Sequence, residues 1–277
     1  MPLWKTEAIT LHSRRWGEAD RIVTLYTLKL GKVRGVARGA RRMNSQFGAG
    51  LEPFGHVEVT FFEKGQDALV RISQVDVRES FLRLRESLAQ MSAAARLVNI
   101  VSALSADRDA GTRIFSTLLN GLQSLQDKCD PVLTSMIVQI QILGHTGFRP
   151  QTDHCASCNN PYALQAARFC AVSGGLLCRH CEGQSHGQSL PMSPGSVAFI
   201  QQARRLPFPA ATRLKAVGQI RREVEAAIEA YIMEVIGRQL PAMDFLAAES
   251  HPPSYGVAND QRPFPPHPME NNIEVSG

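Results

Sequence analysis

Four cysteines are the residues whose type and spacing most clearly predict chemistry in this chain. Cys155 and Cys158 form one CxxC pair, Cys178 and Cys181 form another, and nineteen residues separate the two pairs. Two residues between thiols let both sulfurs turn toward one ion, and two pairs complete a tetrahedral site that usually holds Zn²⁺ at about 2.3 Å. Because four thiolates leave no open coordination position, we predict one structural zinc ion per chain.

The cellular compartment bears on whether the two cysteine pairs hold a metal ion or form two disulfides. The N-terminus has no signal-peptide pattern, and no run of about eighteen apolar residues occurs, so we expect a cytoplasmic protein with no membrane partner. Paired cysteines in a reducing compartment favour metal, and two disulfides are the alternative. His154, Cys170 and His180 could be alternative ligands or partners of the ligands, although Cys170 is more simply a buried thiol.

A zinc hydrolase or deaminase would need a different arrangement. Deaminases combine HxE with PCxxC, and His56–Glu58 matches the first motif. However, His154 and not proline precedes Cys155, and Cys178 and Cys181 would have no role. The chain also lacks a Walker A sequence. GQSHG (183–187) lies in a polar, glycine-rich loop with no predicted strand before it, so it is not a nucleophile elbow. We therefore predict no enzymatic activity and no small-molecule substrate.

A basic segment runs from Lys29 to Arg42 (KLGKVRGVARGARR). It contains six Lys or Arg, no Asp or Glu, and three Gly. In an extended chain Lys32, Arg34 and Arg38 fall on one side and small residues on the other. Because the formal net charge of the whole chain is only +5, this is a local patch suited to the backbone of a polyanion. A solvated edge strand that resists aggregation is the alternative interpretation.

The region that contains the basic segment has apolar residues at every second position in several short runs. Alternating runs bounded by glycine and proline predict five short strands before about residue 77. The predicted strands are Glu7–His12, Arg21–Leu28, Lys32–Arg38, His56–Phe62 and Ala68–Val75. Five short strands without a helix indicate a small β-barrel, and the OB-fold is the five-stranded barrel that binds oligonucleotides.

From about Ser80 the apolar period becomes that of a helix. A long helix is predicted from Phe81 to Val101, and further helices at Arg113–Leu125, Val132–Leu143, Ser193–Leu206 and Leu214–Leu240. The proline-rich end, 249–277, is expected to be disordered. The predicted fold class is therefore α+β multidomain. An OB-fold β-barrel at 1–79 precedes a mainly helical domain at 80–248, with a four-cysteine zinc module embedded at 153–183.

Longer motifs resemble one family of bacterial DNA repair proteins, the RecO family. The resemblance covers about residues 5 to 246 and includes the positions of the two cysteine pairs. The matching stretches are GEADRIVTL (17–25), GKVRGVARGARR (31–42), LEPF (51–54), LGHTGFRP (143–150), RQL (238–240) and DFL (244–246).

This resemblance implies a recombination mediator without catalytic activity, acting at the nucleoid. Such proteins bind single- and double-stranded DNA, anneal complementary strands, and help load recombinase on strands coated with single-stranded-DNA-binding protein. The implied protein partners are RecR and the C-terminal tail of the single-stranded-DNA-binding protein. The implied DNA-binding residues are Lys29, Lys32, Arg34, Arg38, Arg41, Arg42 and, outside the basic segment, Arg15. A zinc-ribbon module for protein assembly, without direct DNA binding, is the alternative function.

Overall fold

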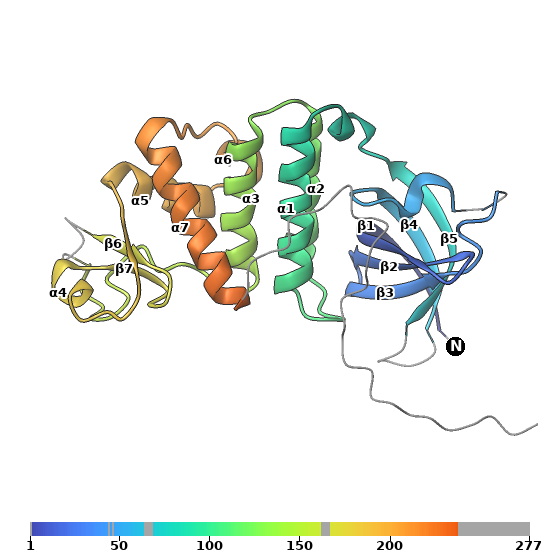
Figure 1. Cartoon of the computed structure of the whole chain (residues 1–277), viewed down its shortest axis with the longest axis horizontal. Coiled ribbons are helices and arrows are strands. Elements are labelled where there is room, and N and C mark those ends of the chain that lie inside the picture. The colour runs from blue at the N-terminus through green and yellow to red at the C-terminus, as the bar shows by residue number, and fades with distance from the viewer. Residues whose placement is uncertain (1, 44, 46, 64–68, 162–166, 238–277) are drawn as a thin grey trace, which may run out of the picture. The chain divides into compact units, whose positions relative to one another are not determined.

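The computed structural model describes residues 2–43, 45, 47–63, 69–161 and 167–237 (Figure 1). The described residues all belong to one unit, Met1–Met243. Several sequence predictions lie outside the described residues, namely Ala68 of the fifth predicted strand, the motifs at 238–240 and 244–246, and the tail at 249–277.

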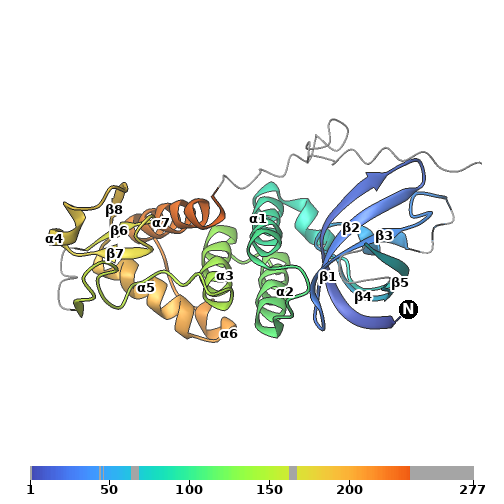
Figure 2. The ribbon, with the colours of Figure 1, turned by 90° about the horizontal axis from the view of Figure 1, so that it is seen from below.

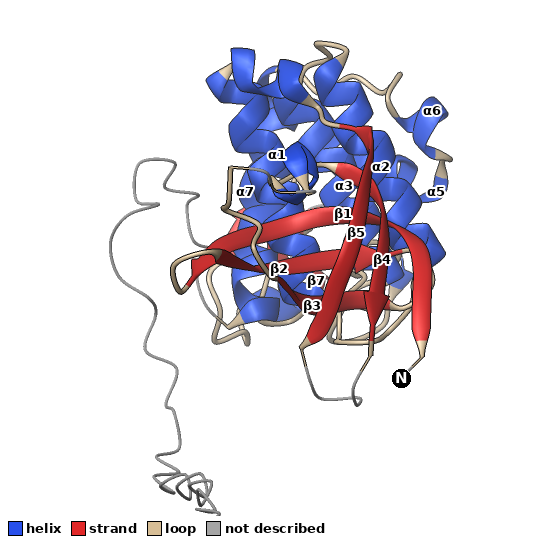
Figure 3. Ribbon diagram, turned by 90° about the vertical axis from the view of Figure 1, so that its right-hand side faces the viewer, coloured by secondary structure: helices blue, strands red, loops and turns tan. Residues whose placement is uncertain are grey.

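Five strands form a closed barrel in the order β1-β2-β3-β5-β4 (Figure 3). Long β1 pairs with β2 through its C-terminal part and with β4 through its N-terminal part, and only the β3–β5 pair is parallel. The strands are β1 (Leu3–Trp16), β2 (Asp20–Thr27), β3 (Gly31–Ala37), β4 (His56–Phe62) and β5 (Val70–Glu79). The predicted fold class, an OB-like barrel followed by a helical part with a cysteine cluster, is confirmed.

The barrel core is built by alternation along each strand. In β4, Val57, Val59 and Phe61 are buried and their neighbours are partly exposed. Gly35 lets β3 lie close to β5, because a Cβ there would stand 2.8 Å from Val70 Cγ2. That separation is shorter than ordinary van der Waals contact, so any larger residue would push the parallel pair apart.

The helical part follows the barrel, and its three long helices α1, α2 and α3 pack side by side (Figures 1 and 2). Helix α3 also contacts α5 and α7, and ten of its residues are buried. The long helices are α1 (Leu88–Leu104), α2 (Thr112–Gln126), α3 (Pro131–His145), α5 (Pro194–Arg205) and α7 (Gly218–Ile236). The shorter elements are η1 (Gly48–Leu51), η2 (Leu82–Glu86), β6 (Arg168–Cys170), β7 (Gly175–Leu177), α4 (Arg179–Glu182), β8 (Ser189–Pro191) and α6 (Phe208–Ala211).

The first predicted helix is shorter than its apolar stripe indicates. Phe81 adopts a left-handed backbone with φ of 49°, the 3-10 helix η2 follows, and Ser87 is extended before α1 begins. Phe81 and Leu84 are buried at a three-residue spacing, which suits a 3-10 turn. Leu88, which the stripe assigned to the core, is 72% exposed.

No helix in the described segments combines the length and the apolar character that a membrane span needs.

Candidate nucleic-acid interface and metal centre

Three neighbouring strands present basic side chains on the outside of the barrel. Arg14 of β1 lies opposite Ile22 of β2, which lies opposite Val36 of β3. Opposed residues share a face, as does every second residue along a strand, so Arg14 shares the outer face with Arg34. The inward residues of β2 and β3 in the barrel core are Val23, Leu25, Val33 and Ala37. We call the outward set Arg14, Lys32, Arg34 and Arg38 the cationic face.

One end of the cationic face is tied to the last turn of α1 and to the loop between α1 and α2. Lys32 Nζ donates to the carbonyl of Ser102 at 2.8 Å and lies 3.3 Å from Asp107 Oδ1. Arg34 Nη2 lies 3.2 Å from Asp107 Oδ2. The side chain of Lys32 is only 16% exposed, whereas that of Arg34 is 60% exposed. Lys32 therefore serves mainly as a link to the helical part, and Arg34 still faces solvent.

The other end of the cationic face is open. Arg38 and Arg42 are exposed, and neither forms an ion pair with any residue in the described ranges. The turn that carries them is fixed, since Gly39 N donates to Asp20 Oδ1 at 2.8 Å and Arg41 Nη1 donates to the carbonyl of Glu18 at 2.9 Å. These bonds hold the turn after β3 against the turn between β1 and β2, with guanidinium groups available to phosphates.

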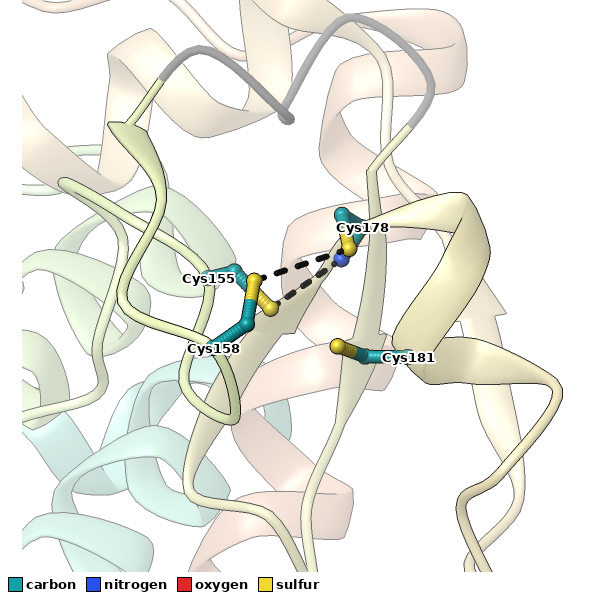
Figure 4. A group of neighbouring side chains, drawn as sticks. All are labelled: Cys155, Cys158, Cys178 and Cys181. Carbon is teal, nitrogen blue, oxygen red and sulfur yellow. Dashed lines mark hydrogen bonds between the residues drawn. The ribbon is translucent and has the colours of Figure 1, made fainter.

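The four cysteines of the two CxxC pairs converge on one point (Figure 4). Their sulfurs all lie within 4.8 Å of one another, and Cys158 Sγ is 3.9 Å from Cys178 Sγ. A tetrahedron with its centre about 2.3 Å from each corner has edges of about 3.8 Å, so the cluster has the dimensions of a zinc–tetrathiolate site. Cys178 N donates to Cys155 Sγ at 3.4 Å. The residues therefore fit a metal ion.

The pKa values of two of these thiols are shifted in opposite directions. Burial opposes ionisation of Cys155, but backbone N–H groups of Cys158, Cys178 and Ser157 outweigh it and lower its pKa to about 6. A hydrogen bond with Ser157 favours ionised Cys181, but hydrogen bonds with neighbouring thiols, together with burial, raise its pKa to about 12. Adjacent thiols compete for negative charge, and a divalent cation would let all four ionise.

Successive residues of β6 and β7 point to opposite faces of the hairpin, and the two faces contact different cores. This arrangement attaches the cysteine cluster to the helical part. Phe169 of β6 and Leu176 of β7 belong to the main helical core, whereas Cys170 and Leu177, one residue later, belong to a small separate core. Phe169 contacts the ring of Tyr231 on α7 edge to face, with 5.9 Å between ring centroids. One face of the hairpin is held by apolar packing, and the other is held by the cysteine cluster.

Comparison with known proteins identifies the family. The family model described as "Recombination protein O N terminal" matches residues 1–81, and "Recombination protein O C terminal" matches residues 85–244. The chain belongs to the RecO family of DNA repair and recombination proteins. The second match alone spans more than half of the chain, and the boundary between the matches falls within η2.

Curated RecO relatives align along most of this chain. The DNA repair protein RecO of Rubrobacter xylanophilus is 33% identical over 249 residues, which cover 87% of this chain and 97% of the relative. The protein of the same name from Symbiobacterium thermophilum is 32% identical, covering 89% and 97%. That from Roseiflexus is 31% identical, covering 88% and 85%.

The structure gathers only part of the basic set expected of a RecO protein. Arg34, Arg38 and Lys32 share the outer face, and Arg41 and Arg42 follow in the adjoining turn. Two predicted residues lie elsewhere. Lys29 is in the turn at the opposite end of β2 and β3, where its Nζ donates to the carbonyl of Lys5 at 2.9 Å. Arg15 lies opposite Arg21, on the other face of the β1–β2 hairpin.

Two residues of this surface were missed by the sequence reasoning. Arg14 and Trp16 have the same parity along β1, so both lie on the face that carries Arg34. The prediction ended the first strand at His12, and the residues up to Trp16 therefore had no assigned face. A signal was present, since Gly17 is a turn residue and a hairpin bounded by it would extend both strands toward it.

The other residues considered as metal ligands have partners of their own. His154 Nε2 lies 2.9 Å from Gln151 Nε2, and His180 Nε2 lies 3.5 Å from Gln184 Nε2. Cys170 Sγ lies 3.3 Å from Ser185 Oγ, and hydrogen bonds with Ser173 and Ser185 lower its pKa although burial opposes this. All six cysteines are free thiols. The structure thus gives a four-cysteine cluster without a disulfide.

His56 and Glu58, the two residues of the HxE motif considered for a deaminase, form hydrogen bonds or ion pairs with other residues of the barrel. His56 Nε2 lies 2.9 Å from Glu7 Oε2, and Glu58 pairs with Lys5 at 2.7 Å and Arg78 at 2.9 Å. Both residues are on β4, whereas the cysteines belong to the segment between α3 and α5. The deaminase hypothesis has no support from this geometry.

Proposed function

We propose that this RecO-family chain is a non-enzymatic recombination mediator. It binds single- and double-stranded DNA, anneals complementary strands, and helps load recombinase onto strands coated with single-stranded-DNA-binding protein. Its protein partners are RecR and the C-terminal tail of the single-stranded-DNA-binding protein, and it acts at the nucleoid in the cytoplasm. The observation that carries this proposal is the cationic face on the outside of an OB-like barrel.

The chemistry of this face suits a DNA backbone better than a base-reading pocket. Guanidinium groups of Arg14, Arg34, Arg38 and Arg42 form charge-assisted hydrogen bonds with phosphates and release counterions, so binding is independent of sequence. At about 0.7 per contact on a single strand, four contacts give a salt slope of about 3. Strands held by their phosphates keep their pairing edges free, which annealing requires.

The cysteine cluster supports this function indirectly. We assign a single zinc ion to Cys155, Cys158, Cys178 and Cys181, where it joins two loops and supplies no catalytic water. We propose that the barrel domain, residues 1–79, binds DNA. The metal ion stabilises the module at 153–183, which is part of the helical domain at 80–248.

The test of this proposal is a triple charge reversal, Arg34→Glu, Arg38→Glu and Arg42→Glu. We expect single-strand affinity at low salt to fall at least about tenfold and the salt slope to decrease by about 2. Annealing of complementary strands coated with single-stranded-DNA-binding protein should be lost as well. Binding is measured by fluorescence anisotropy with oligonucleotides of unrelated sequence, and circular dichroism verifies the fold.

The matched control makes the same change of net charge away from the barrel. Arg213→Glu, Lys215→Glu and Arg222→Glu alter three exposed residues in or near α7, and this variant should bind and anneal normally. If the barrel variant retains full binding and annealing while folded, the cationic face is not the DNA site. A chain that binds no DNA at all would instead favour the protein-assembly alternative.

A further inference from the structure

Trp16 is a large aromatic residue that the fold does not bury. Its side chain is 54% exposed at the C-terminal end of β1, whereas tryptophan is usually highly buried. It belongs to none of the apolar cores of the described chain, and its indole N–H has no hydrogen-bond partner among the described residues. The β1–β2 hairpin that it terminates extends past the body of the barrel (Figure 3). The packing of the barrel therefore does not explain why a tryptophan occupies this position.

The hairpin end that carries Trp16 holds charges of both signs: Arg14 and Arg15 precede the indole, Glu18 is exposed in the turn, and Asp20 across the hairpin is engaged. Asp20 lies opposite Trp16, and its Oδ1 accepts the hydrogen bond from Gly39 N at 2.8 Å. Arg14 lies two residues earlier on the same face, about 6.6 Å away along the strand. Arg41, whose guanidinium reaches the carbonyl of Glu18, holds the following turn beside the hairpin. The indole and the Arg14 side chain thus project from the same face of β1, two residues apart.

We propose that Trp16 is a stacking platform for one base of a single DNA strand whose phosphates lie on the cationic face. This inference rests on the proposed function and deepens it. An indole offers a π surface to any base, so stacking adds affinity without sequence preference. In a duplex both faces of each base are covered by its neighbours, and Trp16 gives no such gain. A stacked base keeps its pairing edge free, so the contact is compatible with annealing.

Intrinsic fluorescence gives a direct test, because the chain has two tryptophans. Trp4 is partly buried and its Nε1 donates to Glu63 Oε2 at 2.8 Å. The variant Trp4→Phe leaves Trp16 as the single reporter. Oligo(dT) should quench its emission, whereas an oligomer of abasic sites with the same phosphate backbone should bind with little quenching. Equal quenching by both oligomers would overturn the stacking proposal.

Affinity measurements on Trp16→Ala provide the second test. Single-strand affinity should fall roughly 5- to 150-fold, as expected for one base–aromatic stack. Duplex affinity should change less than about twofold, and the salt slope should stay constant because no phosphate contact is lost. Trp16→Phe, which retains an aromatic face, should recover most of the affinity and controls for folding.

The outcomes separate this inference from the proposed function. If Trp16→Ala binds single strands normally while the triple arginine variant does not, the stacking role falls and the cationic face stands. Loss of binding to RecR or to the single-stranded-DNA-binding protein, with oligo(dT) binding intact, would assign the indole to a protein contact and also overturn stacking. If the triple arginine variant binds normally, the proposed function itself fails.

Discussion

At the scale of single residues, Glu223 shows how one carboxylate joins two helices. Its Oε2 accepts hydrogen bonds from Ser193 N at 2.7 Å and Ser196 Oγ at 2.6 Å at the start of α5, and its Oε1 accepts one from Gln219. Burial alone would raise the pKa of Glu223, but hydrogen bonds from Ser196, Ser193 and Gln219 outweigh it and lower the pKa to about 2. The ionised carboxylate therefore stabilises the contact between α5 and α7.

The pH dependence of this contribution follows from the lowered pKa. A carboxylate with a folded pKa of about 2 and an ordinary value of 4.5 binds fewer protons in the native state. Its stabilisation is fully present above about pH 4.5 and is lost as pH falls toward 2. Glu223→Gln should reduce the free energy of unfolding by roughly 1–2 kcal/mol at pH 7, allowing for solvent screening, and by less at pH 3.

Urea denaturation of wild type and Glu223→Gln at pH 7, 4 and 3 measures this difference. Glu225→Gln is the matched control, since Glu225 is exposed on the same helix and forms no hydrogen bond or ion pair with the described residues. A difference between wild type and Glu223→Gln that is as large at pH 3 as at pH 7 would contradict the assignment.

At the scale of elements, the cysteine segment cannot fold by apolar burial alone. Strands β6, β7 and β8 are three residues long, and the core beside them consists of Cys155, Cys170, Leu177, Cys178 and Cys181. So short a sheet with so small a core is unstable by itself. Under the proposed zinc assignment, metal binding supplies the missing local stability, while Phe169 anchors the other face to α7.

Removing one ligand should release the metal and loosen this element alone. In Cys158→Ser we expect the zinc content to fall well below one ion per chain. Amide exchange in residues 151–161 and 167–191 should accelerate at least about tenfold, and exchange in the barrel should not change. Inductively coupled plasma analysis and hydrogen exchange provide the measurements.

Cys129→Ser is the control for this variant, because Cys129 is an exposed cysteine outside the cluster. It should retain the zinc content and the exchange pattern of the wild type. Stoichiometric zinc in Cys158→Ser, or a wild-type chain without zinc after purification in zinc-containing medium, would contradict the metal assignment.

Sequence patterns predicted the elements better than the surfaces they form. Period-two alternation located all five barrel strands, and the CxxC spacing identified the four cysteines that converge. The ends of strands depend on the partner strand, so β1 extends to Trp16 although its alternation stops earlier. Tertiary contacts also decide which charges are available, and no local pattern shows that Asp107 pairs with Lys32.

At the scale of the whole described chain, the barrel and the helices meet through side chains from both. Tyr26 on the outer face of β2 is fully buried in the main core that includes α1, α2 and α3. The loop between α1 and α2 reaches the barrel, where Arg108 N donates to the carbonyl of Lys32 at 3.0 Å. Gly31 adopts φ of +64°, and a Cβ there would overlap the backbone carbonyl of Asp109, so only glycine permits this approach.

The same loop carries Asp107, whose negative charge offsets part of the positive charge of the proposed DNA site. Asp107 contacts both Lys32 and Arg34, so Asp107→Asn should free positive charge on the cationic face. We expect single-strand affinity to rise about two- to fivefold at low salt, since exposed ion pairs are worth up to about 1 kcal/mol, and the gain should vanish at high salt. Asp127→Asn changes the charge equally at an exposed position after α2 and should have little effect. Anisotropy titrations across a salt series decide the question, and unchanged affinity in Asp107→Asn would mean that this end of the face does not contact DNA.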